Sequence, residues 1–184
     1  MRNYQSRTPS MSKEEAIQLH AEALVIDAQQ PPATTGFLFN SAMQAELERM
    51  NLAGYTREEA HSRLLKLAAN EIQNQQSAMD DYFSVWDSSG ITVGAGTYAG
   101  GTKIETAFED AVTLLAQARS IIDASNGKLI LVRKASDIEL AYKNGIHGLI
   151  MDFQDTLPYG TDLDRIDMFH NLGIRQVQLT YNLR

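Results

Sequence analysis

The sequence predicts an α/β fold of the (β/α)8 TIM-barrel type, of which this chain holds the first four to five βα units. Short apolar runs alternate with amphipathic stretches along the whole chain, and continuous apolar runs are typical of parallel strands that helices cover. The last two predicted units repeat at about 25 residues, the compact period of a barrel. A complete barrel takes roughly 250 residues, whereas the chain has 184 and ends on a strand. We therefore expect residues 1–184 to be the N-terminal part of one barrel domain, from a truncated or processed chain.

The predicted strands are the short apolar runs at 24–27, 91–93, 128–132, 148–156 and 174–181, the fourth of which opens into a polar turn. Helices that each carry one apolar stripe are expected at about 12–23, 40–51, 56–87, 103–125, 136–144 and 162–172. Capping boxes predict helix starts at Ser12, Thr56 and Ser136, because each is followed three residues later by glutamate. The stretch 56–87 forms either one long helix or two with a bend near 74–77. Residues 40–88 are predicted to be a helical insertion after the first strand.

A glycine-rich run at 94–101 follows the second predicted strand and is expected to be a loop. Its first three glycines miss the spacing of the dinucleotide-binding fingerprint by one residue. Gly96 and Gly101 have the spacing of a phosphate loop, but Thr102 and Lys103 stand in the reverse of the required order. We interpret these glycines as allowing a tight turn and the close approach of a helix.

Composition excludes several classes of function. A formal net charge of -7 argues against sequence-independent binding to nucleic acid, which needs a basic surface. The absence of cysteine excludes disulfides, thiolate nucleophiles and cysteine-ligated zinc. No apolar run approaches the roughly 18 residues of a membrane span. We expect a soluble, cytoplasmic protein, with a removed leader as the alternative.

Polar residues follow three of the predicted strands at their carboxyl ends, where the chemistry of a barrel lies. Asp27 is a candidate metal ligand, because carboxylate oxygens suit a hard cation. An alternative is that Asp27 and Asp152 cap neighbouring backbone amides, as polar residues at strand ends commonly do. The candidates for catalysis are Asp152, Gln154 and Asp155, and the candidates for substrate binding are Gln29, Gln30, Thr180, Tyr181 and Asn182.

The four histidines do not fall at these strand ends. His20, His61 and His170 lie within predicted helices, and His147 precedes the fourth strand at the opposite end of the barrel. We therefore expect them to be surface or helix-packing residues rather than ligands or bases.

Three segments resemble the renal (membrane) dipeptidase family: 24–27 behind an amphipathic helix, 148–155, and 162–182, which is the most specific. The resemblance covers about residues 12–184, and the helices between 40 and 87 match poorly. It implies an amidohydrolase-like (β/α)8 barrel in which a glutamate bridges two zinc ions. Members of this family hydrolyse dipeptides, often with a D-residue at the carboxyl side, so the resemblance implies a small peptide or amide substrate.

The sequence departs from this family at its metal ligands. The family's first strand ends in Asp-Gly-His-x-Asp, where the histidine and the last aspartate bind metal. Gln29 and Pro31 stand at those two positions here, and Gln154 stands where the bridging glutamate is expected. A neutral amide cannot bridge two zinc ions as a carboxylate does, and proline has no ligand atom. The chain is most similar to a branch of dipeptidase-like proteins with a Phe-Gln-Asn/Asp-Thr turn.

The resemblance favours a dipeptidase-like metallohydrolase of dipeptides or related amides, with a degenerate zinc site in this chain. Two other hypotheses stay open. One is a metal-free barrel, altered or inactive as an enzyme, that binds a small molecule. The other is a half-barrel that a second chain or another copy in a homo-oligomer completes. The remaining family histidines would lie beyond Arg184.

Overall fold

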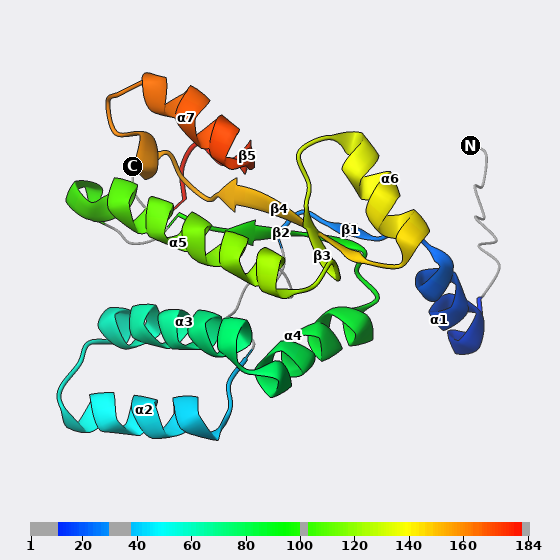
Figure 1. Ribbon diagram of the computed structural model, residues 1–184, viewed down its shortest axis with the longest axis horizontal. Helices are drawn as coiled ribbons and strands as arrows, with labels where there is room; N and C mark the ends of the chain where they lie inside the picture. The colour runs from blue at the N-terminus through cyan, green and yellow to red at the C-terminus, as the bar shows by residue number, and fades with distance from the viewer. Residues whose placement is uncertain (1–10, 30–37, 100–102, 182–184) are drawn as a thin grey trace, which may run out of the picture.

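The computed structural model describes residues 11–29, 38–99 and 103–181, and the structural statements below concern those residues. Helices alternate with strands along the chain, and the strands form one central parallel sheet (Figure 1). In chain order the elements are α1 (Lys13–Glu22), β1 (Ile26–Asp27), α2 (Ser41–Leu52), α3 (Arg57–Asn74), α4 (Gln76–Ser89), β2 (Val93–Thr97), α5 (Ile104–Ala124), β3 (Leu129–Leu131), α6 (Ala135–Asn144), β4 (His147–Phe153), the 3-10 helix η3 (Leu157–Tyr159), α7 (Asp164–Leu172) and β5 (Ile174–Val177). The predicted α/β class is confirmed.

The strands do not follow one another across the sheet in sequence order. β2 pairs with β1 on one side and with β4 on the other. β3 pairs with the first half of β4, and β5 pairs with the second half along the same edge. At the carboxyl end of the sheet the order of neighbouring strands is therefore β1-β2-β4-β5. Near the amino end, β3 is the neighbour of β4 on that edge. Hydrophobic periodicity predicts that these strands exist, but it does not specify their neighbours.

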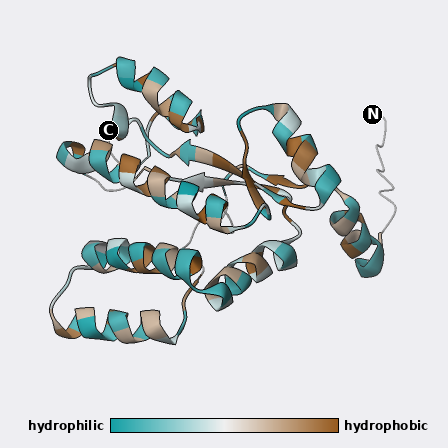
Figure 2. Ribbon diagram, viewed as in Figure 1, coloured by the Kyte–Doolittle hydropathy of each residue, from teal (hydrophilic) through white to brown (hydrophobic). Residues whose placement is uncertain are grey.

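The two faces of β4 pack against different helices. Leu149, Met151 and Phe153 belong to the larger core, together with buried residues of α3, α4, α5 and α7. Ile150 points to the opposite face, because side chains alternate along a strand, and it packs with Val93 and with the α6 residue Ala141. Figure 2 shows hydrophobic residues along β3 and β4 and mixed colouring on the surrounding helices. We call the face that carries Ile150 the inner face.

Gly148 occupies a crowded position on this inner face. A Cβ atom there would lie 2.8 Å from Val132 Cγ2 and 2.9 Å from Val93 Cγ2. We therefore expect Gly148→Ala to lower the free energy of unfolding by about 1–3 kcal/mol, the usual cost of overpacking. Urea unfolding would measure the loss. Adding Val132→Ala removes one of the clashing methyl groups, so the double variant should lose less than the sum of the two single variants; additive losses would contradict the explanation.

Two expectations about the strands are wrong in detail. The first strand was expected to be buried, but Leu24 is 40% and Ile26 48% exposed, because β2 is the one described strand that pairs with β1. The glycine run at 94–101 was expected to be a loop, but its first half forms β2. Gly94 and Gly96 pair in register with Leu149 and Met151. The large side chains of Leu149 and Met151 fill the sheet face on which the two glycines have no side chain.

The helices confirm most of the predicted boundaries. Capping boxes at Ser12 and Thr56 are present, and the stretch 56–87 is two helices that separate at Gln75. The capping box predicted at Ser136 is wrong, because α6 begins at Ala135 and the Asp137 carboxylate accepts the backbone N–H of Arg133 and Lys134. No described helix is long and apolar enough to cross a membrane.

Glu46 of α2 pairs with Arg49 on the same helix and with Arg63 on α3, and the second pair joins the two helices. Its carboxylate lies 2.7 Å from Arg49 Nε and 2.6 Å from Arg63 Nε. The hydrogen bond from Arg49, followed by that from Arg63, lowers the pKa of Glu46 from 4.5 to about 2. Since the folded pKa is depressed, the contribution to stability is complete above 4.5 and is lost as the pH falls toward 2.

We expect the stability difference between the wild type and Glu46→Gln to be small, because the site is exposed. The difference should shrink as the pH falls from 4.5 to 2 and should weaken in high salt. Chemical unfolding across this pH range measures it, with Glu48→Gln on the same helix as the matched control. A difference that grows on acidification would contradict the assignment.

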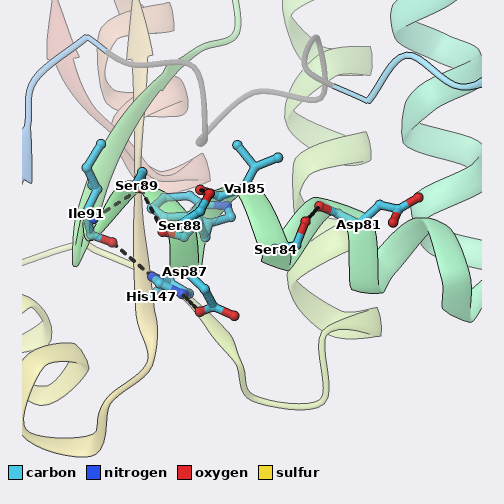
Figure 3. A network of polar contacts seen from close by, with 9 residues as sticks. Asp81, Ser84, Val85, Asp87, Ser88, Ser89, Ile91 and His147 are labelled. Carbon is cyan, nitrogen blue, oxygen red and sulfur yellow. Dashed lines mark hydrogen bonds and ion pairs between the residues drawn. The ribbon is translucent and has the colours of Figure 1, made fainter.

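His147 begins β4 at the amino end of the sheet, as expected. Its Nδ1 lies 3.0 Å from the Ile91 carbonyl oxygen and its Nε2 3.0 Å from Asp87 Oδ1 (Figure 3). The ring also packs against Trp86, with centroids 4.8 Å apart. His20 is held by a second contact of this kind, between its Nε2 and the Ser89 carbonyl oxygen at 2.9 Å. These histidines connect helices and strands at the end of the sheet away from the strand carboxyl ends.

Candidate functional site

Three polar side chains stand side by side where β2, β4 and β5 end. Asp152 pairs in register with Thr97 on one side and with Gln176 on the other. The pairing between β4 and β5 shifts between Met151 and Asp152, so that one residue more is used on β5. Such bulges re-aim side chains and recur next to functional sites. The shift places Gln176 beside Asp152.

Asp152 is a buried carboxyl group, with 1% of the residue exposed. Its Oδ1 atom has no hydrogen-bond partner among the described residues. Burial raises the pKa of Asp152, and hydrogen bonds from the Thr97 and Gln29 side chains oppose this rise. A buried acceptor without a partner costs about 1–3 kcal/mol, so a fold keeps one only where the surrounding structure compensates. This makes Asp152 the centre of the candidate site.

Two glutamines bring β1 into the same cluster. Gln29 Nε2 donates to Thr97 Oγ1 at 2.8 Å, and Gln176 Nε2 donates to the Ala28 carbonyl oxygen at 2.9 Å. The second bond joins the ends of β1 and β5, which are separated in the sheet by β2 and β4. The sheet must curve for this contact to form, with Asp152 and Thr97 on its concave inner side. We call Gln29, Thr97, Asp152 and Gln176 the Asp152 cluster.

The raised pKa of Asp152 gives a prediction for stability. Between the ordinary value of 3.8 and the raised folded value, the unfolded chain loses its proton first. The contribution of Asp152 to stability should therefore be highest below pH 3.8 and should fall as the pH rises toward the folded pKa. Asp152→Asn lacks this titration, so its stability relative to the wild type should increase over the same range. Unfolding at a series of pH values tests this, and parallel curves for the two proteins would contradict it.

The other two candidate aspartates have one oxygen engaged in their own turns. Asp27 Oδ1 accepts the Gln29 N–H at 3.1 Å, and Asp155 Oδ1 accepts the Leu157 N–H at 2.9 Å. Asp27 also pairs in register with Gly94, which puts it on the sheet face opposite that of Thr97 and Asp152. The capping alternative therefore describes Asp27, whereas Asp152 is held by side chains. Gln154 and Asp155 are half-buried in the turn after β4.

Aromatic rings support this turn from the outer face. Phe153 packs edge-to-face against Phe169 of α7 at 4.9 Å between centroids and against Tyr159 of η3 at 5.8 Å. Phe169 also meets Phe108 of α5 at 5.7 Å. Phe153, the residue that precedes Gln154, is thus held by rings of two other elements, α7 and η3, and α5 supports the ring on α7. These contacts fix the path of the chain as it leaves β4.

The predicted substrate-binding residues after β5 lie close to the same turn. Gln178 N–H donates to the Phe153 carbonyl oxygen at 2.8 Å, and the Thr156 hydroxyl donates to the Leu179 carbonyl oxygen at 3.3 Å. Thr180 and Tyr181 follow directly and are exposed. Gln30, Pro31 and Asn182, which the sequence also singled out, lie outside the described residues.

Thr97 and Gln176 are members of the cluster that the sequence did not single out as site residues. Thr97 was hidden in the glycine-rich run, although it is the hydroxyl residue that ends that strand. Gln176 lies within a predicted strand, and its one signal is a polar residue between Ile174 and Val177. The bulge that turns Gln176 inward depends on strand pairing.

The described residues do not fit a centre of two zinc ions. Gln154, which the resemblance sets at the place of the bridging glutamate, carries a neutral amide. Gln29 donates an amide hydrogen to Thr97. Asp27 lies on the other sheet face. Within the described ranges, no three His, Cys, Asp or Glu residues are grouped so that they could hold a metal ion.

Comparison with known proteins confirms the fold. No protein-family model and no curated protein matches the sequence. Among solved structures, an amidohydrolase from Pseudomonas aeruginosa matches with TM-score 0.53 at 18% identity, over 91% of this chain and 37% of that one. The dipeptidase AC, a metallopeptidase of family M19, gives TM-score 0.52 at 17% identity, over 85% of this chain and 42% of that one. The probable dipeptidase PvdM from Pseudomonas aeruginosa gives 0.56 at 13%, over 91% and 37%.

The chain thus spans about two fifths of the length of these structures. This share agrees with a partial barrel, since the described residues form a five-stranded sheet and a complete barrel has eight strands. The resemblance to the renal dipeptidase family is confirmed at the level of the fold. The chain has the fold of part of a TIM-barrel-type amidohydrolase or M19 dipeptidase.

Proposed function

We propose that this chain is part of a dipeptidase-like hydrolase that cleaves dipeptides or related amides, with a site in which the Asp152 cluster replaces the family's first metal ligands. One observation carries the proposal: a buried carboxyl group with a partnerless oxygen lies at the carboxyl end of a strand in a hydrolase-like fold. Barrel enzymes keep their chemistry at this edge. Burial of a titratable group in such a place is a mark of function.

The described residues suggest a division of roles. Asp152 holds and orients the substrate, because its carboxyl group is buried and fixed by Thr97 and Gln29. Asp155 has one carboxylate oxygen outside its turn bond to Leu157 and is the candidate to accept a proton from the attacking water. Gln154, half-buried between them, is the candidate to hold the substrate carbonyl. Gln29, Gln30, Thr180, Tyr181 and Asn182 are the proposed substrate-binding residues, of which Gln30 and Asn182 lie outside the described residues.

Hydrolysis by the full-length protein tests the proposal. We expect release of free amino acids from a panel of dipeptides that includes D-residues at the carboxyl side, and loss of this activity in Asp155→Asn. Elemental analysis of the purified protein measures any zinc, and less than two zinc ions per chain is expected from the replaced ligands. A full panel without cleavage would contradict the proposed function.

A second candidate is a metal-free barrel that binds a small molecule without cleaving it. The hydrogen-bonded set of Gln29, Thr97, Asp152 and Gln176 favours this alternative, since it supplies recognition groups without metal ligands. Binding of a dipeptide that is recovered uncleaved would support it, and stoichiometric zinc would exclude it.

The lateral edges of the sheet suggest that further strands complete the barrel. Ile26 in β1 is 48% exposed and Leu179 after β5 is 80% exposed. Apolar side chains at open sheet edges are normally covered. We propose that a later segment, a second chain or another copy covers them. Light scattering of this 184-residue chain tests this: a stable monomer would contradict closure by another copy.

The helical insertion at 40–88 and the cytoplasmic location stay predictions.

A further inference from the structure

The hydrogen bonds of the Asp152 cluster leave it with acceptors and few free donors. The Ala28 carbonyl oxygen can only accept, so the Gln176 contact fixes that amide with its nitrogen toward Ala28 and leaves its Oε1 as an acceptor without a described donor. Thr97 donates to the Asp152 carboxyl group, so it must accept from Gln29, which likewise leaves Gln29 Oε1. Together with the partnerless Asp152 Oδ1, the cluster holds three side-chain oxygens that lack a described donor.

This arrangement specifies the chemistry of a ligand. A primary ammonium group carries one positive charge and three N–H donors, which matches one carboxylate and two amide oxygens. A hard cation such as Ca²⁺ takes six to eight oxygens and usually several carboxylates, whereas Asp152 is the one carboxylate of the cluster. None of the ion pairs of the described residues involves Asp152, so this buried acid lacks a counter-charge from them.

The residues of the cluster range from exposed to buried, as expected of a binding site for a small polar group. Gln29 is exposed, Thr97 and Gln176 are half-buried, and Asp152 is buried. A cation that replaces the missing partner of Oδ1 would remove the cost of an unpaired buried acceptor, and the net charge of -7 favours the approach of cations.

We propose that Asp152, Gln29 and Gln176 form a recognition site for the primary ammonium group of a small ligand. This inference deepens the proposed function, on which its choice of substrate rests, since a dipeptide presents a free α-amino group. Under the proposed division of roles, Asp152 binds that ammonium group while the turn at 154–155 faces the peptide bond.

The test uses amine probes that contain no hydrolysable bond, so that binding is measured independently of cleavage. Alaninol is titrated into the full-length protein, and N-acetylalaninol, which lacks the ammonium group, is titrated as its matched control. The side-chain carboxyl resonance of Asp152 and the backbone amide resonances around it report binding by NMR. We expect alaninol to shift these resonances and N-acetylalaninol to leave them in place.

Variants of the protein locate the site. Asp152→Asn should weaken alaninol binding by about 10- to 100-fold, the worth of a hydrogen bond to a charged group. Gln176→Met and Gln29→Met should each weaken it by a smaller factor. Asp123→Asn removes the same charge from an exposed position on α5 and should bind as the wild type does. Thermal unfolding confirms that each variant is folded.

The outcomes separate this inference from the proposed function. Alaninol binding that depends on Asp152 supports the ammonium site even if no dipeptide is cleaved. Equal binding to the wild type and to folded Asp152→Asn, or equal binding of the acetylated probe, overturns it even if dipeptides are cleaved. A shift of the Asp152 resonance by CaCl2 without one by alaninol also overturns it, in favour of a metal site.

Discussion

Replacing Asp152 with asparagine is expected to lower kcat/KM for alanyl-alanine by about 10- to 100-fold in the full-length protein, because a hydrogen bond to a charged group is worth roughly 1.5–3 kcal/mol. The carboxyl group binds the substrate equally before and during the reaction in the proposed roles. The loss should therefore appear mainly as a higher KM with a similar kcat. Steady-state kinetics at one pH measure both constants.

The matched comparison is Asp155→Asn, three residues further along the same turn. This variant removes the proposed proton acceptor, so kcat should fall by about 100-fold or more while KM changes little. Both variants keep the size of the side chain. If Asp152→Asn lowers kcat and leaves KM unchanged, Asp152 acts on the chemical step and the proposed division of roles is wrong.

The elements of this fold were predictable from the sequence because local signals agree with the final structure. The apolar run of β4 ends at Asp152 and is bordered by glycine and a polar turn, and its burial confirms it as a central strand. Ser12 and Thr56 begin helices because their side chains and those of the glutamates three residues later satisfy free backbone N–H groups. β2 was missed in part because glycine disfavours strands, and only its pairing with Leu149 and Met151 overrides that preference.

The site was predictable to the extent that it depends on strand ends. Asp152 was singled out by position, but the choice between a cap and a buried acid needs the structure, since both follow from the same sequence. Gln176 depends on the bulge opposite Met151 and Asp152, and a one-residue shift in register exchanges the faces of a strand. No local pattern in the sequence encodes that shift.

Phe169→Ala is expected to destabilise the protein by about 3–5 kcal/mol, the usual cost of truncating a buried phenylalanine. Phe169 is 0% exposed and its ring packs edge-to-face against those of Phe153, Tyr159 and Phe108. Each such pair is worth about 0.5–1.5 kcal/mol beyond the buried area. Urea unfolding monitored by circular dichroism measures the loss, which should appear as a lower midpoint with a similar slope.

Leu163→Ala provides the control next to the same helix. Leu163 is 75% exposed, so its truncation should change the free energy of unfolding by less than about 0.5 kcal/mol. Phe169→Leu keeps most of the apolar volume and should lose less than the alanine variant.

Because Phe153 leads directly into Gln154 and Asp155, loss of its partner ring should also loosen the turn. The amide resonances of those two residues should then broaden or shift in folded Phe169→Leu. Unchanged resonances would show that the turn after β4 holds its shape without the aromatic cluster, and that the candidate site is built by the strands alone.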